Sequence, residues 1–157
     1  MTTRLSSCYT VRFNDCDPLG HLNNARYIDY FLNAREDHLK EYYQIDLRQF
    51  AAKGVSWVVT AHEILYIRPV VYNDRVTIQS ETIEVGESHL LVEMLLFDES
   101  AENLKAIMWT RFTHISLKTG KRELHSEEFM DFARTTLSPG RDLQGGLKAR
   151  VEELMQR

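Results

Sequence analysis

The sequence has few of the features that would tie it to an oxidising compartment, a membrane or a nucleic acid. Its 157 residues include two cysteines, Cys8 and Cys16, and residues 1–7 are polar, so we expect a chain without a secretory signal whose thiols stay reduced in the cytoplasm. No apolar run approaches the ~20 residues that a membrane-spanning helix needs. The formal net charge is −4, which gives no support to general nucleic-acid or membrane-surface binding.

Several signatures of catalytic sites are also missing. The two cysteines and six histidines show no zinc-ligand spacing, so we expect no metal. The sequence has no glycine-rich phosphate loop and no Gly-x-Ser-x-Gly elbow. No histidine is placed by spacing to activate Cys16, which favours a small buried cysteine over a nucleophilic thiol. Any catalytic chemistry must therefore come from other side chains.

The overall composition, with 43% hydrophobic and 27% charged residues, is that of one ordinary globular domain. Alternation of apolar and polar residues predicts a strand at 9–14, after a frayed terminus at 1–8. From Asn24 to about Tyr43 the period changes to that of a helix with a broad apolar stripe. We expect this helix to be central, with Asn23 or Asn24 as its N-cap.

Four further strands are predicted after a connector at 44–54. They are expected at 55–70, 75–85, 88–97 and 104–117. Their connections are short, which favours antiparallel neighbours. Ser126 is expected to cap a short helix, and Leu147, Val151 and Leu154 predict a final amphipathic helix docked on this or a neighbouring subunit.

This order of elements indicates an α+β domain. One apolar helix and five antiparallel strands suit a curved sheet that wraps the helix. Such a sheet has exposed edges, and an oligomer that continues the sheet would cover them. We see no internal repeat and no low-complexity segment.

The most informative stretch runs from the first strand into the long helix. The strand breaks at Asp17-Pro-Leu-Gly20, because proline cannot donate to a ladder and Gly20 permits a positive φ. Asp17 then lies a few residues before a helix N-terminus, where backbone N–H groups are free. A carboxylate beside such donors is half of a site for acyl transfer, and we expect the donors around Leu22 to Asn24.

Residues 15–27, which read DCDPLGHLNNARY, resemble the signature of the hotdog-fold thioesterases. The similarity is to the 4-hydroxybenzoyl-CoA thioesterase-like branch, which includes bacterial long-chain acyl-CoA thioesterases. The Arg68-Pro-Val segment resembles the family's turn after the second strand. The resemblance spans about residues 8–120, so it implies a single hotdog domain over 1–157 with a C-terminal helical extension at about 121–157.

The resemblance implies a five-stranded antiparallel sheet around the helix, and a homodimer or homotetramer with its sites at the subunit interface. Asp17 matches the catalytic carboxylate, and the backbone N–H of Asn24 matches the group that polarises the thioester carbonyl. Another branch has a histidine where this sequence has Asn24 and a tyrosine where it has Phe13. The chemistry therefore falls on Asp17, as a nucleophile or as a general base.

Other residues have both a structural and a functional interpretation. We count Gly20 with Asp17 and the backbone of Asn24 as the catalytic residues, because it forms the turn of the site. The side chains of the motif and of the long strand can contact substrate or merely support the fold. His62 and Glu63 are adjacent on a strand, so they point to opposite faces and are unlikely to act together. The residues that we assign to substrate binding are His21, Asn23, Tyr27, His62, Glu63 and Arg68, with Arg75 and Lys105 as further contacts for the phosphates of coenzyme A.

The predicted function is hydrolysis of an acyl-CoA thioester to free acid and coenzyme A, with no cofactor other than the coenzyme A of the substrate. One alternative is an acyl-carrier-protein thioesterase, which would need a surface for docking a protein. The other is a non-catalytic module that binds acyl thioesters, because a fold alone does not secure activity. Asp17 argues against that module, since a pure binder has no need of a carboxylate beside the thioester.

Overall fold

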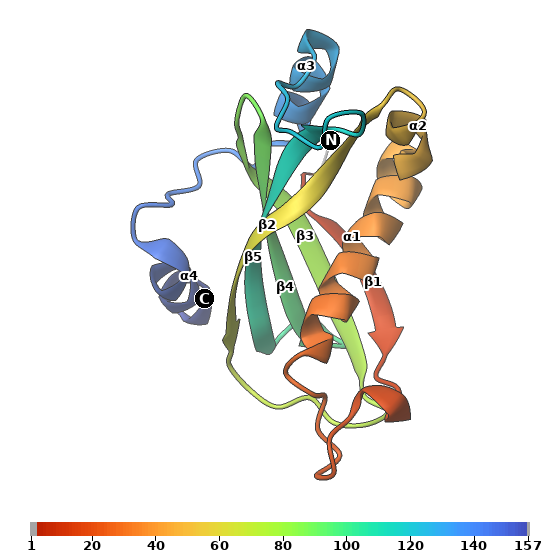
Figure 1. Cartoon of the computed structure of the whole chain (residues 1–157). Coiled ribbons are helices and arrows are strands. Elements are labelled where there is room, and N and C mark those ends of the chain that lie inside the picture. The colour runs from red at the N-terminus through yellow and green to blue at the C-terminus, as the bar shows by residue number, and fades with distance from the viewer. Residues whose placement is uncertain (1–2, 157) are drawn as a thin grey trace.

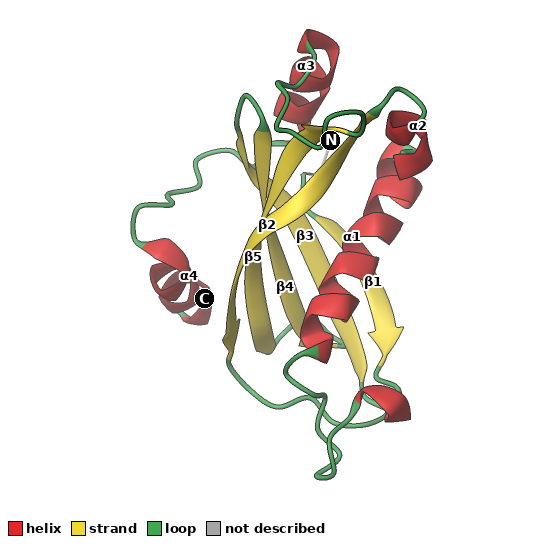
Figure 2. Ribbon diagram, in the orientation of Figure 1, coloured by secondary structure: helices red, strands yellow, loops and turns green. Residues whose placement is uncertain are grey.

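Five strands wrap around one long helix in the computed structural model, which describes residues 3–156 (Figures 1 and 2). The elements are β1 (Leu5–Thr10), η1 (Phe13–Asp15), α1 (Arg26–Tyr43), α2 (Leu47–Ala51), β2 (Val55–Tyr66), β3 (Arg75–Val85), β4 (His89–Asp98), β5 (Leu104–Ser116), α3 (Glu127–Thr136) and α4 (Gly146–Met155).

The sheet has the strand order β1-β3-β4-β5-β2, and every neighbouring pair is antiparallel. This confirms the predicted hotdog arrangement. The prediction that consecutive strands are neighbours is correct for β3, β4 and β5 but wrong for β2 and β3. β2 ends at Tyr66, and residues 67–74 then cross past the start of α1 to the other side of the sheet (Figure 1). The crossing makes β2 an edge strand.

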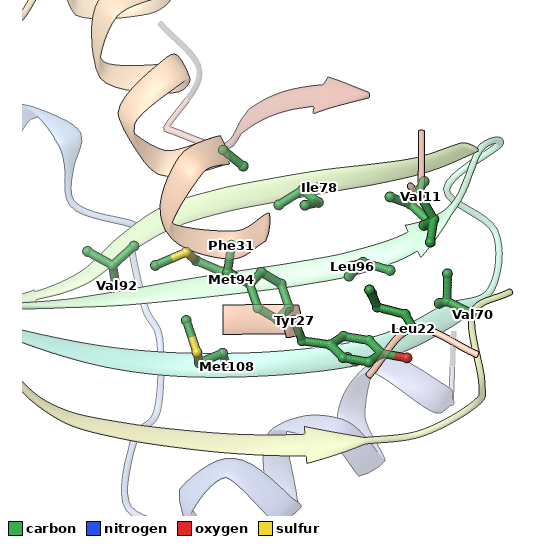
Figure 3. Packing of buried hydrophobic residues seen from close by; sticks show 13 residues of the cluster. Val11, Leu22, Tyr27, Phe31, Val70, Ile78, Val92, Met94, Leu96 and Met108 are labelled. Carbon is green, nitrogen blue, oxygen red and sulfur yellow. The ribbon is translucent and has the colours of Figure 1, made fainter. Parts of the chain in front are cut away.

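The main core lies between α1 and the concave face of the sheet. Tyr27, Phe31 and Ala34 point from α1 into this core, as the apolar stripe predicts (Figure 3). Burial of each large apolar side chain contributes about 1.5–3 kcal/mol. The sheet and loops contribute Val11, Leu22, Val70, Val76, Ile78, Val92, Met94, Leu96, Ala106 and Met108.

The prediction for the first strand is wrong in its position. β1 begins at Leu5, inside the segment predicted to be frayed, and ends at Thr10, while Phe13 is 79% exposed in the short η1 turn. Local alternation cannot reveal that the small residues at 6–8 are ordered by pairing with Ile78 and its neighbours on β3. The connector at 44–54 also contains α2, whose N-cap Asp46 accepts a hydrogen bond from the N–H of Arg48.

The predicted N-cap of the long helix is also wrong. α1 begins at Arg26, with Ala25 at the N-cap position and no side-chain cap. Asn23 instead closes the preceding turn, because its Oδ1 accepts from the N–H of Ala25 at 2.9 Å. The helix therefore starts two residues later than predicted, and Asn24 lies in the turn that leads into it.

The C-terminal segment forms two helices that pack on different parts of the sheet. Ser126 caps α3, as predicted, by accepting from the N–H of Phe129 at 3.1 Å. α4 packs its apolar side chains against the face of β4 and β5 that is turned away from α1, where Ile107 and Trp109 are buried. The final helix thus docks on the sheet of its own chain (Figure 1).

A buried ion cluster fixes this docking. Glu93 on β4 is 2% exposed and accepts hydrogen bonds from Trp109 Nε1 at 3.0 Å, Arg141 Nη1 at 2.6 Å and Arg150 Nε at 2.9 Å. Arg141 also donates to Glu81 at 2.7 Å. Burial would raise the pKa of Glu93, but the hydrogen bonds and charges of Arg150 and Arg141 outweigh burial and lower it.

Candidate active site

The turn after η1 holds the carboxylate of Asp17 in one orientation. Its Oδ1 accepts from the N–H of Leu19 at 2.9 Å and from the N–H of His21 at 3.0 Å. Gly20 has a φ of +79°, and its N–H donates to the carbonyl of Asp17 at 2.9 Å. Glycine adopts this φ without strain. Within residues 3–156 no hydrogen bond engages Asp17 Oδ2, so this oxygen is not needed to hold the turn.

Asp17 lines a cleft of about 240 Å³ where the loop, the start of α1 and the end of β2 meet. The Tyr66 hydroxyl donates to the carbonyl of Asn24 at 2.7 Å, and the rings of Tyr27 and Tyr66 pack edge to face at 5.0 Å. These contacts tie β2 to the turn before α1. The cleft is lined by Asp17, His21, Leu22, Asn24, Tyr27, Tyr66, Ile67, Arg68 and Pro69.

The backbone donors near the carboxylate are fewer than predicted. The N–H of Leu22 donates to the carbonyl of Val70 at 2.7 Å, and that of Asn23 donates to the carbonyl of Asp15 at 2.9 Å. The N–H of Asn24 has no acceptor in the described part of the chain. Asn24 is thus the one residue of the three whose N–H remains available to a bound carbonyl oxygen.

The remaining residues of the predicted site are not all in this cleft. His21, Tyr27 and Arg68 line it, whereas the exposed side chain of Asn23 is engaged in the turn. His62 faces the α1 side of the sheet, where its Nδ1 lies 2.8 Å from Thr110 Oγ1 and burial lowers its pKa.

Glu63 is exposed on the opposite face of the sheet. It is paired in register with Trp109, whose side chain lies on the face of the sheet that α4 covers. The expectation that His62 and Glu63 point apart is therefore confirmed. Neither side chain reaches the Asp17 cleft of its own chain.

Cys16 has the properties of a thiol and not of a reactive thiolate. Burial raises its pKa, and the nearby carboxylates of Asp15 and Asp17 raise it further. Its Sγ donates to the carbonyl of Arg12 at 3.4 Å.

Among the described residues no cluster of three or more histidine, cysteine or acidic side chains is arranged to hold a metal ion. The same residues form no helix that is long and apolar enough to cross a membrane.

A second, larger cavity of about 370 Å³ lies at the other end of α1, between this helix, α3 and the sheet. Its walls are mainly aliphatic and aromatic, and include Trp57, Phe112 and Phe129. The α1 residues that line this cavity run from Leu32 to Tyr43, whereas Tyr27 lines the Asp17 cleft, and no residue lines both hollows. The two hollows are therefore separate within one chain.

Tyr66 and the larger cavity are not among the features predicted from the sequence. Tyr66 lies at the end of the long strand with the same parity as His62, which is a signal that it points to the helix side. The cavity had no comparable signal, because its walls come from seven elements that only the fold brings together.

A long helix enclosed by a five-stranded antiparallel sheet is the hotdog fold, which is the class of the thioester hydrolases similar to this chain. The chain belongs to the Thioesterase-like superfamily, whose family model matches residues 11–133. This confirms the resemblance seen in residues 15–27.

The proteins similar to this chain include several thioesterases. This chain is 31% identical over 112 residues to the long-chain acyl-CoA thioesterase FadM of Escherichia coli K12. The aligned segment covers 71% of this chain and 83% of that protein. The crystal structure of YbaW, a probable thioesterase from Escherichia coli, superposes with a TM-score of 0.74 at 27% identity, over 85% of this chain and 99% of that one. A DHNA-CoA thioesterase from Staphylococcus aureus shares the fold, with a TM-score of 0.75 at 17% identity over 98% of this chain and 93% of that one.

Proposed function

We propose that this thioester hydrolase acts on acyl-CoA, releasing the free acid and coenzyme A. The observation that carries the proposal is that Asp17 and Asn24 line one cleft, and that the N–H of Asn24 has no acceptor among residues 3–156. The similarity to an acyl-CoA thioesterase supports coenzyme A as the carrier. No cofactor is required, because coenzyme A enters as part of the substrate.

In this mechanism the N–H of Asn24 donates to the carbonyl oxygen of the thioester and stabilises the oxyanion that forms there. Asp17 either removes a proton from a water molecule that attacks the carbonyl carbon, or attacks this carbon itself to give a mixed anhydride that water then hydrolyses. On either route the carbon–sulfur bond breaks, and the thiolate of coenzyme A leaves and is protonated.

A second copy of the chain completes the site in this proposal. β2 is an edge strand, and Val58 and Val59 on it are each 40% exposed. Exposed apolar side chains on a free edge favour pairing with another strand. If two copies of β2 pair antiparallel about an axis between Thr60 and Ala61, Tyr66 of one chain lies opposite Val55 of the other.

This pairing would bring the Asp17 cleft of one chain, which Tyr66 lines, beside the apolar cavity of the other, which Ser56, Trp57 and Val59 line. The thioester would then lie at Asp17 and the acyl group would extend into the partner's cavity. Arg68, which is exposed and lines the cleft, would contact the phosphates of coenzyme A.

The cytoplasm is the proposed location. Cys8 and Cys16 are both free, as is usual for proteins of a reducing compartment.

The test is release of free thiol from a series of acyl-CoA thioesters of increasing chain length. We expect kcat/KM on the order of 10⁴ M⁻¹s⁻¹ or more for at least one of them. Hydrolysis of the matching acyl-carrier-protein thioesters alone would favour an acyl-carrier-protein thioesterase. Saturable binding of the acyl-CoA without any thiol release would instead indicate a binding module.

A further inference from the structure

We propose that the cavity between α1, α3 and the sheet binds an acyl group whose far end carries a carboxylate, and that Arg35 is the residue that recognises it. This inference rests on the proposed function, because it identifies the class of acyl group that the same site takes. It makes Arg35 a specificity-determining residue in the wall of the acyl pocket.

Arg35 is a buried cation without an acidic partner. It lies in the middle of α1, is 8% exposed and lines the cavity. Its guanidinium donates to Ser80 Oγ at 2.8 Å and to Thr82 Oγ1 at 3.0 Å. Within residues 3–156 no carboxylate lies within 4.0 Å of it. Two hydroxyl groups orient the guanidinium but do not neutralise it, and an unpaired buried charge is costly.

The acidic residues nearest to this position are engaged elsewhere. Glu36 also lines the cavity, but its carboxylate lies 3.4 Å from Lys40 Nζ and is largely exposed. Glu81 is on the strand that carries Ser80, yet its side chain points to the other face of the sheet and pairs with Arg141. The charge of Glu81 still attracts that of Arg35 through space, but no carboxylate of the described residues forms an ion pair with this guanidinium, which leaves it able to bind one from a ligand.

The neighbouring histidine, His38, does not change the net charge around Arg35. His38 is fully buried between Ser7 and Ser80, with ring nitrogens 2.7 Å from both hydroxyl groups. Burial and the adjacent charge of Arg35 lower the pKa of His38 to about 4. Burial lowers the pKa of Arg35 to about 10. At neutral pH the site thus holds one positive charge, on Arg35.

The rest of the cavity suits a carbon chain. Its walls include Leu32, Leu39, Trp57 and Phe132, which can pack against methylene groups or a ring. A carboxylate at the end of the acyl group would meet the planar donors of the guanidinium, the geometry that arginine binds most strongly. A methyl end would leave the same guanidinium uncompensated, so the cavity should discriminate against it.

The test compares two acyl-CoA thioesters of equal chain length, one ending in a carboxylate and the other in a methyl group. We expect wild-type kcat/KM to be at least ~10-fold higher for the first, and Arg35→Met to reduce this ratio by at least ~10-fold, as the loss of one charge-assisted hydrogen bond implies. The matched control is Arg134→Met, at an exposed arginine of α3 that lies outside the cavity, which should leave the ratio as in wild type.

Calorimetry with the corresponding free diacid and monoacid tests binding without hydrolysis. Tighter binding of the diacid by wild type, lost in Arg35→Met, would support the inference. If Arg35→Met does not fold, Thr82→Val, which removes one of the two hydroxyl groups that orient the guanidinium, should reduce the same preference.

Equal or weaker binding of the diacid by wild type would overturn the role of Arg35. Hydrolysis of methyl-ended substrates with no preference for the carboxylate would overturn it too, while leaving the proposed function intact. If neither substrate is hydrolysed but the diacid still binds more tightly, the proposed hydrolysis is rejected while the carboxylate site at Arg35 is supported.

Discussion

Asp17→Asn is expected to lower kcat for acyl-CoA hydrolysis by ~10³-fold or more. The amide oxygen of asparagine can still accept from the N–H groups of Leu19 and His21, so the turn should keep its shape. The amide nitrogen can neither remove a proton from water nor attack the thioester. Steady-state thiol release measures the loss, and calorimetry with an acyl-CoA measures whether binding is retained.

The matched control is Asp29→Asn, because Asp29 is an exposed aspartate on the first turn of α1. This variant should hydrolyse acyl-CoA like the wild type. Full activity of Asp17→Asn would reject the assignment of the carboxylate. A single turnover in isotopically labelled water tests the nucleophilic route, since label enters the side chain of Asp17 only if Asp17 has formed the anhydride and water has attacked its aspartyl carbonyl.

Glu93→Gln is expected to reduce the free energy of unfolding by about 3–5 kcal/mol. The neutral amide leaves the buried guanidinium groups of Arg141 and Arg150 without the charge that now compensates them. α4 should be loosened from the outer face of the sheet, and urea unfolding measures the change. Glu128→Gln, at an exposed glutamate in the first turn of α3, is the control and should change stability by less than ~0.5 kcal/mol.

The same carboxylate gives stability a defined pH dependence. Its pKa is lower in the folded chain than the ordinary value of 4.5, so its contribution is fully present above about pH 4.5 and is lost as the pH falls through the lower, folded value. The difference in stability between wild type and Glu93→Gln should therefore shrink in acid. A difference that stays constant down to the acid transition would contradict the role of the ion cluster.

An element could be predicted from the sequence when its local hydrophobic pattern agrees with its environment in the folded chain. The stripe of Tyr27, Phe31 and Ala34 faces the core as its spacing predicts, and β3 has the predicted bounds. The first strand was misplaced because its residues are ordered by pairing with β3 and not by their own alternation. The start of α1 was misplaced because the side chain of Asn23 closes a turn before the helix and does not cap it.

The candidate site could be predicted only as far as one stretch of sequence contains it. The loop of Asp17 and the amide of Asn24 lie in a single motif, whereas Tyr66 joins them only because β2 returns to the start of α1. Arg35 was visible as a charged residue beside the apolar stripe of the helix. That it lacks an acidic partner is a property of the packed structure, and no spacing in the sequence could reveal it.

In the proposed dimer, Asp17 of one chain acts on a thioester whose acyl group lies in the cavity of the other. The most direct test mixes Asp17→Asn with Ala133→Trp, which fills the cavity through a buried residue of α3. Each variant alone should be nearly inactive. Mixed dimers should regain activity, because one of their two sites combines an intact Asp17 with an open cavity. If both variants fold and assemble but every mixture stays as inactive as its parents, the shared site is contradicted.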